Sequence, residues 1–227
     1  MEKFFHTLRG CPLFDGINEE NYFQMLRCFG YRTMKLKRGN TVFSEGDPAT
    51  GVGIVLSGSV HTLQEDYLGN RSIVSMAGPG ELFCEGFSCA KVEALPVNIV
   101  ASSDSEVMIL DCSKILTICH NACSFHNRMV RNLLHSVANS NLRLNQKIEI
   151  LSKRTTREKV MSYLLSEAKF QGTDSFFIPY DRQELADYLG VERSAMSTVI
   201  SKLHNEGIID VNRKWFRILK NNKEDLP

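Results

Sequence analysis

Basic and hydroxyl side chains gather between residues 182 and 217, and together they could recognise DNA. An arginine can bind a guanine edge or a phosphate, and serine or threonine hydroxyls reach base edges or phosphates at short range. The candidate contacts are Arg182, Arg193, Ser194, Ser197, Thr198, Lys202, Lys214 and Arg217. Among them, we expect Arg193, Ser194 and Ser197 to contact bases.

Two short helices must position these side chains. Asp181 and Glu184 predict a capping box at the start of the first helix, and Gly190 suits the left-handed backbone that ends it. The second helix is predicted to bury an apolar stripe of Ala195, Met196, Val199, Ile200 and Leu203. This pattern predicts a helix-turn-helix whose second helix enters the major groove. A plain helical hairpin with a solvated polar face is the alternative.

The segments on either side favour the DNA-binding interpretation. Thr155 and Glu158 predict another capping box, which opens a scaffold helix. Residues 208–211 and 215–219 have the pattern of two short strands joined by a turn. Such a β-hairpin wing would place Lys214 and Arg217 where they can touch phosphates.

Composition and charge are compatible with this role but do not select it. A chain of 227 residues can form two modest domains. The formal net charge is +1, so DNA binding must depend on where the basic residues lie. Seven cysteines without paired spacings do not describe a disulfide framework. No signal-peptide pattern or bilayer-length apolar run is present, so we expect a soluble cytoplasmic protein with no membrane contact.

The first half of the chain changes from helical to strand periodicity. Residues 2–30 carry apolar side chains at helical intervals. Residues 31–111 are cut by glycines into short β-branched segments, which is typical of an antiparallel β-barrel or jelly roll. Strands are predicted at 41–43, 53–56, 60–63, 72–76, 97–101 and 106–110. The predicted fold class is therefore α+β.

A long helix is predicted between the barrel and the C-terminal domain, over residues 113–151. Its coiled-coil seam has residues alternately four and three apart: Val130, Leu134, Val137, Asn141, Leu144, Ile148 and Leu151. One chain offers no second helix for this seam, so we expect a parallel homodimer. Asn141 would either form a buried pair that fixes the register or lie partly solvated where the seam drifts.

Three motifs follow one another along the predicted barrel: Phe-Ser-Glu-Gly-Asp at 43–47, Gly-Ile-Val-Leu-Ser-Gly-Ser-Val at 53–60, and Gly-Glu-Leu-Phe at 80–83 with Glu85 behind it. They resemble the cyclic-nucleotide-binding-type barrel of the Crp/Fnr family of bacterial transcription regulators. The resemblance extends over nearly the whole chain in the family's order of domains. It implies an effector-sensing domain at 1–112, a dimerisation helix at 113–151 and a winged helix-turn-helix domain at 152–227.

The resemblance also implies where an effector would bind. In cyclic-AMP-binding members a glycine-glutamate pair precedes an arginine-serine pair, the glutamate taking the ribose hydroxyl and the arginine neutralising the phosphate. Glu85 matches the glutamate, but Cys84 replaces the glycine, and Leu95 and Pro96 stand in place of arginine and serine. The free-energy cost of burying a phosphate without its cation is prohibitive. Cyclic AMP is therefore not expected, unless another cation such as Lys91 substitutes.

Iron-sulfur members of the family carry closely spaced cysteines near the N-terminus. Here that region holds Cys11 and Cys28 alone, so no such cluster is expected. Cys84 and Cys89 could form a redox pair or react with an electrophile, or they could fill space beside the barrel.

Histidine and cysteine residues elsewhere could bind a metal or haem as the signal. Cys119, Cys123 and His126 share one predicted helix face, where two copies could form a soft-metal site or simply pack. His61 could ligate haem or have a structural part. The sequence therefore leaves the effector unidentified.

The sequence as a whole favours a homodimeric, sequence-specific DNA-binding transcription regulator that responds to a signal at the barrel. A symmetric dimer implies a pseudo-palindromic site with half-sites about one helical turn apart, and the resemblance implies RNA polymerase as a partner. The family's guanine-reading arginine is matched here by Thr198, which puts the usual half-site in doubt. The alternative is a ligand-binding or redox/metal-sensing regulatory subunit without DNA function. An enzyme is not expected, because no nucleophile-base set, Walker loop or spaced metal motif is present.

Overall fold

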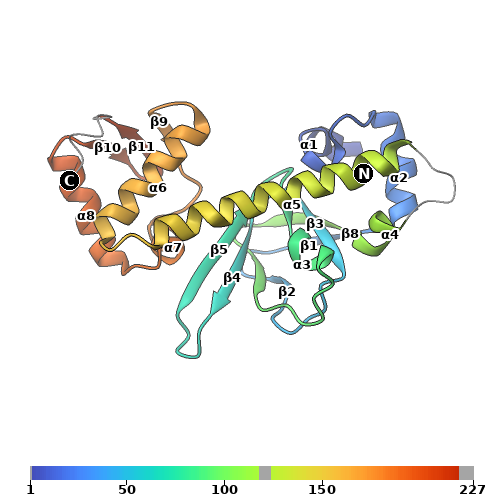
Figure 1. Cartoon of the computed structure of the whole chain (residues 1–227), viewed down its shortest axis with the longest axis horizontal. Coiled ribbons are helices and arrows are strands. Elements are labelled where there is room, and N and C mark those ends of the chain that lie inside the picture. Colours follow the sequence, from blue (N-terminus) through green and yellow to red (C-terminus); the bar gives the residue numbers. More distant parts are fainter. Residues whose placement is uncertain (1, 118–123, 220–227) are drawn as a thin grey trace. The chain divides into compact units, whose positions relative to one another are not determined.

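The computed structural model describes residues 2–117 and 124–219 (Figure 1). Contacts divide the chain into two units, Met1–Leu142 and Arg143–Pro227, and the division falls inside the long helix α5 (Ser124–Leu151). Among the described residues, no helix combines the length and apolar character needed to cross a membrane.

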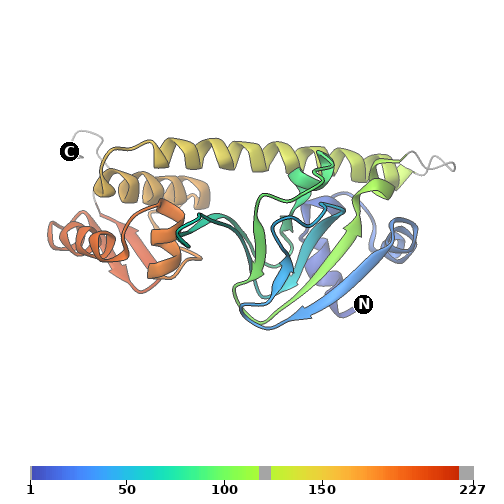
Figure 2. The same ribbon diagram turned by 90° about the horizontal axis from the view of Figure 1, so that it is seen from below.

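The first unit contains an antiparallel barrel. Its strands are β1 (Tyr31–Leu36), β2 (Thr41–Phe43), β3 (Gly51–Ser57), β4 (Val60–Glu65), β5 (Arg71–Ala77), β6 (Leu82–Phe83), β7 (Asn98–Ala101) and β8 (Ser105–Asp111). They form two four-stranded sheets, ordered β1-β8-β3-β6 and β2-β7-β4-β5, whose curvature is visible in Figure 2. The interleaved order confirms the predicted jelly roll. β1 and β6 are absent from the predicted set of strands.

Short helices precede and follow the barrel strands. The N-terminal ones are α1 (Phe5–Arg9) and α2 (Tyr22–Phe29). A 3-10 turn at Glu2–Phe4 precedes α1, and two more, at Pro12–Phe14 and Glu19–Asn21, lie between α1 and α2. Helix α3 (Glu85–Cys89) follows β6, and α4 (Cys112–Leu116) follows β8. The predicted unbroken helix from residue 113 is wrong. Asp111 caps a separate helix α4, and Thr117 is extended, with φ −83° and ψ 132°.

The barrel has a core on each side of β3 and β8. Because side chains alternate along a strand, Val52, Ile54 and Leu56 of β3 pack with the helices, whereas Val55 faces the barrel interior. The helix-side cluster includes Phe14, Tyr22, Phe29, Met108, Met129 and Leu133; the interior cluster includes Phe43, Val60, Phe83, Leu95, Ile99 and Val107. Both faces of β3 are therefore buried, and helix α5 is attached to the barrel through Met129 and Leu133.

Gly53 shows how closely the two core layers approach. A Cβ placed on Gly53 would lie 2.1 Å from Cζ of Phe83, a separation that no side chain tolerates. Glycine at this position lets the Phe83 ring cover β3 directly.

The second unit contains three helices after α5 and a small sheet. Helices α6 (Thr156–Gln171), α7 (Arg182–Leu189) and α8 (Arg193–Asn205) accompany strands β9 (Ser175–Phe177), β10 (Ile209–Asn212) and β11 (Trp215–Ile218). The strand order is β10-β11-β9, all antiparallel. The capping box at Thr155 is confirmed: its Oγ1 accepts from the N–H of Glu158 at 3.1 Å, and its own N–H donates to the Glu158 carboxylate at 2.9 Å.

Candidate nucleic-acid interface and effector pocket

Helix α7 begins at the predicted capping box. The Asp181 carboxylate accepts from the N–H of Glu184 at 2.9 Å, and the Glu184 carboxylate accepts from the N–H of Asp181 at 2.7 Å. Gly190 has φ +59° and donates its N–H to the carbonyl of Ala186, so α7 ends where the left-handed backbone favours glycine. Helix α8 starts directly after this turn, which confirms the predicted helix pair.

Helix α8 buries a narrower stripe than the sequence predicts. Met196, Ile200 and Leu203 are the buried side chains, at helical spacing. Ala195 is exposed, so its predicted inward orientation is wrong, and Val199 is half-buried. Each residue turns the helix by about 100°, which rotates Ala195 off the face centred on Met196. Its methyl group therefore joins the outward surface, where an apolar side chain can meet a thymine methyl.

The outward face of α8 carries the predicted base contacts. Arg193, Ser194, Thr198 and Lys202 are exposed, and Ser197 is half-buried. The Thr198 hydroxyl donates to the carbonyl of Ser194 at 3.0 Å. Because its proton is used inside the helix, Thr198 offers outward an acceptor and a methyl group. That chemistry suits a base amino group or a thymine methyl better than a phosphate oxygen.

Arg182 lies at the start of α7 and packs inside the domain. Its guanidinium carbon lies 5.1 Å from the centre of the Phe216 ring, and burial lowers the pKa of Arg182. Its buried Nη1 has no hydrogen-bond partner among the residues that the structure describes. Arg182 is thus held against the wing strand β11.

The wing places its basic residues in two environments. Arg217 is exposed on β11, whereas Lys214 donates to the carbonyl of Pro179 at 2.5 Å and lies 4.0 Å from the Glu184 carboxylate. The turn also exposes Arg213, with φ +54°, which the sequence reasoning missed. The signal was present, since Arg213 is the middle residue of the predicted turn between the two strands.

Two contacts between helices stabilise the second unit. Arg157 of α6 forms a two-pronged ion pair with Glu206 after α8, at 2.5 and 3.2 Å. Lys147 of α5 lies 4.4 Å from the Tyr188 ring centre, and burial lowers the pKa of Lys147 to about 8. Helices α5, α6, α7 and α8 are therefore linked within the second unit by charged groups as well as by apolar packing.

The predicted effector site includes Glu85, the first residue of α3. Its side chain is buried, and its carboxylate accepts from the Ser140 hydroxyl of α5 at 2.5 Å. Cys84 before it has φ +65°, a left-handed conformation that costs a non-glycine residue roughly 1 kcal/mol or more. The backbone thus keeps a shape suited to glycine although the side chain has changed. Sequence reasoning missed Ser140, because no local pattern links it to Glu85.

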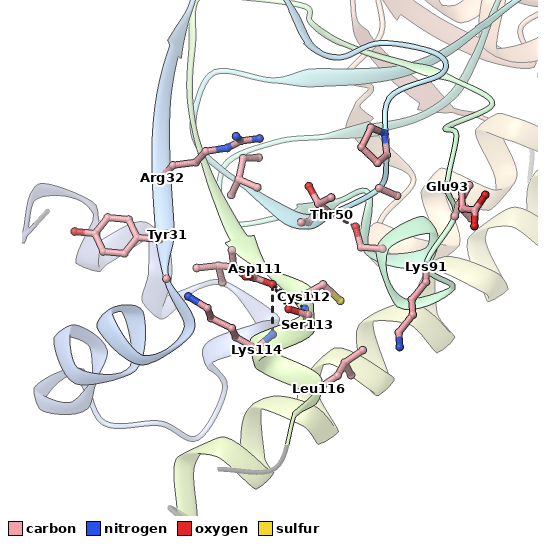
Figure 3. Close-up of a pocket in the computed structure, with 18 residues that line it drawn as sticks. Tyr31, Arg32, Thr50, Lys91, Glu93, Asp111, Cys112, Ser113, Lys114 and Leu116 are labelled. Carbon is pink, nitrogen blue, oxygen red and sulfur yellow. Dashed lines mark hydrogen bonds between the residues drawn. The ribbon is translucent and has the colours of Figure 1, made fainter. Parts of the chain in front are cut away.

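The other predicted pocket residues do not provide a cation. Leu95 is buried in the barrel interior, and Pro96 is exposed. Lys91 lines a separate cavity of about 840 Å³, among whose lining residues Glu85, Leu95 and Pro96 are absent (Figure 3). Neither Leu95 nor Pro96 can therefore neutralise a phosphate.

The structure describes one of the three candidate metal ligands, His126. Cys119 and Cys123 lie outside the described residues. His126 is buried, with Nε2 at 2.8 Å from the carbonyl oxygen of Ile115 and its ring in a T-shaped contact with Phe29. His61 is buried on β4. Within residues 2–117 and 124–219, no three histidine, cysteine or acidic side chains are grouped to hold a metal ion.

The predicted dimer seam of α5 is largely open to solvent. Leu134 is 67% exposed and Ile148 is 61% exposed. Asn141 and Leu144 are also exposed, while Val130, Val137 and Leu151 are half-buried. The helix therefore presents an apolar row that its own chain leaves uncovered among the described residues.

Two family models match the two parts of the chain that contain these sites. A family model described as a cyclic nucleotide-binding domain matches residues 33–122, and one described as a Crp-like helix-turn-helix domain matches residues 158–223. Among solved structures, FixK2 from Bradyrhizobium japonicum superposes with a TM-score of 0.65 at 21% identity, covering 86% of this chain and 94% of that one. The structural likeness extends over both units.

Sequence relatives agree with these matches. The transcriptional activator protein FnrA of Stutzerimonas stutzeri is 27% identical over 193 residues, which is 83% of this chain and 77% of FnrA. A cyclic AMP receptor protein of Thermus thermophilus is 27% identical over 202 residues, 89% of each chain. The chain belongs to the Crp/Fnr family, whose members are DNA-binding transcription regulators rather than enzymes.

Proposed function

We propose that this chain acts as a homodimer that reads a pseudo-palindromic DNA site through α8 and contacts phosphates through the wing. The observation that carries the proposal is the outward face of α8, where Arg193, Ser194 and Thr198 are exposed beside each other. We assign effector sensing to residues 1–112, dimerisation to 113–151 and DNA binding to 152–227. RNA polymerase is the expected partner of a regulator of this kind.

DNA binding is tested by measuring affinity for a site selected from a random duplex library and for a random duplex. Arg193→Ala should cost about 1 to 3 kcal/mol on the selected site and little on random DNA. The matched control is Arg213→Ala at the wing turn, which should weaken both duplexes alike and reduce the salt dependence. Equal losses for Arg193→Ala on both duplexes would make it a phosphate contact. No salt-dependent binding to either duplex would favour a regulatory subunit without DNA function.

The homodimer is supported by the uncovered apolar row of α5. Burying a leucine or isoleucine contributes about 1.5 to 3 kcal/mol, so the seam residues of two copies together would hold a dimer. Leu134→Lys should shift the mass measured by light scattering towards the monomer. Leu142→Lys is the matched control, because Leu142 is 65% exposed but lies off the seam. A dimer that survives the first change, or is lost with both, would contradict this interface.

The effector is proposed to differ from cyclic AMP, although one relative is named a cyclic AMP receptor protein. Glu85 already accepts a hydrogen bond from Ser140, and Leu95 and Pro96 replace the arginine and serine that bind phosphate. Isothermal titration should therefore detect no cyclic AMP binding at micromolar concentration. Micromolar or tighter binding would show that another cation serves the phosphate.

A further inference from the structure

Two cysteines far apart in the sequence meet beside the barrel. Cys89 ends α3 and Cys112 begins α4, and their Sγ atoms lie 4.0 Å apart. A disulfide requires an S–S distance of about 2.05 Å, so the sulfurs must approach by roughly 2 Å. Both residues lie at helix ends, and Cys89 leads into a turn where Lys91 has φ +53°. The pair can therefore close without disrupting a long element.

The two thiols have different environments. Cys112 is buried and Cys89 is half-buried. The pKa of Cys89 is lowered, because the Cys112 thiol hydrogen-bonds to its sulfur, and the pKa of Cys112 is raised by the same contact. Burial instead raises the pKa of Cys11 to about 12 and that of Cys84 to about 11. Cys89 is the more exposed of the two thiols, and the thiolate is the nucleophile. Cys89 is therefore the attacking sulfur and Cys112 the resolving one.

Cys112 lines a cavity of about 840 Å³ (Figure 3). Cys89 is not among the lining residues, but its sulfur lies 4.0 Å from that of Cys112. Three exposed basic side chains, Arg32, Lys91 and Lys114, also line it. The lining also includes two acidic residues, Asp111 and Glu93. Asp111 already caps α4, because its carboxylate accepts from the N–H groups of Ser113 and Lys114. Clustered basic groups raise the local concentration of anions, so this cavity suits a small anionic reagent.

We propose that Cys89 and Cys112 form a reversible disulfide by exchange with a low-molecular-weight disulfide that carries carboxylates, such as glutathione disulfide. The Cys89 thiolate attacks one sulfur of the small disulfide, whose S–S bond breaks, and one small thiolate leaves. Cys112 then loses its proton and attacks Cys89 Sγ, which releases the second small thiolate. Two protein thiols are oxidised, one small disulfide is reduced to two thiols, and the protein's thiol protons end on those thiols.

The disulfide would join α3 to α4, the short helix that precedes α5 in the chain. Helix α3 also carries Glu85, which binds Ser140 of α5. Oxidation at the end of α3 would therefore act on the same short helix that contacts α5. The exchange chemistry itself does not depend on DNA binding, so its test is independent of the proposed function.

The test uses the reduced full-length protein, treated with glutathione disulfide, blocked with iodoacetamide and mapped by mass spectrometry. We expect a Cys89–Cys112 cross-link that dithiothreitol reverses. Cys112→Ser should accumulate the mixed disulfide at Cys89, and Cys89→Ser should leave Cys112 reduced. Cys28→Ser is the matched control, because Cys28 is exposed and outside the pair, and it should still form the cross-link. The proposal would be overturned if Cys89 and Cys112 both stayed reduced in the unaltered protein, or if a mixed disulfide persisted there.

A second measurement tests the role of the cavity. Lys91→Gln with Lys114→Gln should slow the reaction with glutathione disulfide by about 3-fold or more, through loss of electrostatic attraction. The reaction with the uncharged hydroxyethyl disulfide should keep its rate. Equal slowing with both reagents, or with neither, would rule out the anionic specificity.

Discussion

The hydrogen bond between Ser140 and Glu85 gives the sharpest test of how the barrel holds α5. The Ser140 hydroxyl donates to a carboxylate oxygen at 2.5 Å, and the Glu85 side chain is 7% exposed. A hydrogen bond to a charged group contributes about 1.5 to 3 kcal/mol, and removing the donor leaves the buried acceptor unsatisfied. Ser140→Ala should therefore lower the free energy of unfolding by about 2 kcal/mol.

The assay is urea unfolding followed by circular dichroism, at one protein concentration because a dimer's stability depends on it. Ser136→Ala is the matched control. Ser136 also lies on α5, where it is buried, but its hydroxyl donates to the carbonyl of Asn132 in the same helix, at 2.9 Å. That substitution should cost less than about 1 kcal/mol. The double-mutant cycle of Ser140→Ala with Glu85→Gln should give a coupling energy of about 1 kcal/mol or more. A coupling near zero, or equal losses for Ser136 and Ser140, would refute the reasoning.

Two further substitutions test the packing and charge of the units. Gly53→Ala should lower the free energy of unfolding by about 1 to 3 kcal/mol through overpacking, because the new Cβ would meet the Phe83 ring. Gly86→Ala is the control: a Cβ there meets no atom within 4 Å, so the same unfolding assay should show a neutral or stabilising effect. Burial lowers the pKa of Lys147 to about 8, so between about pH 8 and pH 10 the unfolded state binds more protons and the free energy of unfolding rises with pH. The free energy of unfolding should be about 1 to 3 kcal/mol higher at about pH 9.5 than at about pH 7.5, and Lys147→Met should remove this rise. A rise that is unchanged in Lys147→Met would show that another group causes it.

Features that depend on neighbouring residues could be predicted from the sequence. Both capping boxes, the turn at Gly190 and the wing involve residues a few positions apart, so spacing alone specifies them. The same holds for most barrel strands, whose β-branched runs are bounded by glycines. Strand β1 was missed because its residues are mostly exposed, which removes the alternation that marks a half-buried strand.

Contacts between distant segments could not be predicted. Glu85 and Ser140 are 55 positions apart, and Cys89 and Cys112 are 23 apart. Periodicity shows which face of a helix or strand is apolar, but it does not show which polar groups meet when the elements pack. The sequence therefore suggested Cys84 as the partner of Cys89, whereas the structure pairs Cys89 with Cys112.

The bond between Glu85 and Ser140 also constrains how an effector can act. A ligand that takes the place of Ser140 on Oε1 of Glu85 gives up a bond of about 1.5 to 3 kcal/mol, which reduces its apparent affinity by roughly 10- to 150-fold. By linkage, such a ligand would remove one of the contacts between α5 and the barrel as it binds, while Met129 and Leu133 stay packed in the core. Oxidation of Cys89 and Cys112, at the other end of the same short helix, has no such competition because it leaves the carboxylate in place. A signal at the thiols and a ligand at Glu85 would therefore reach α5 by different routes, and Ser140→Ala should weaken the coupling of either to the helix.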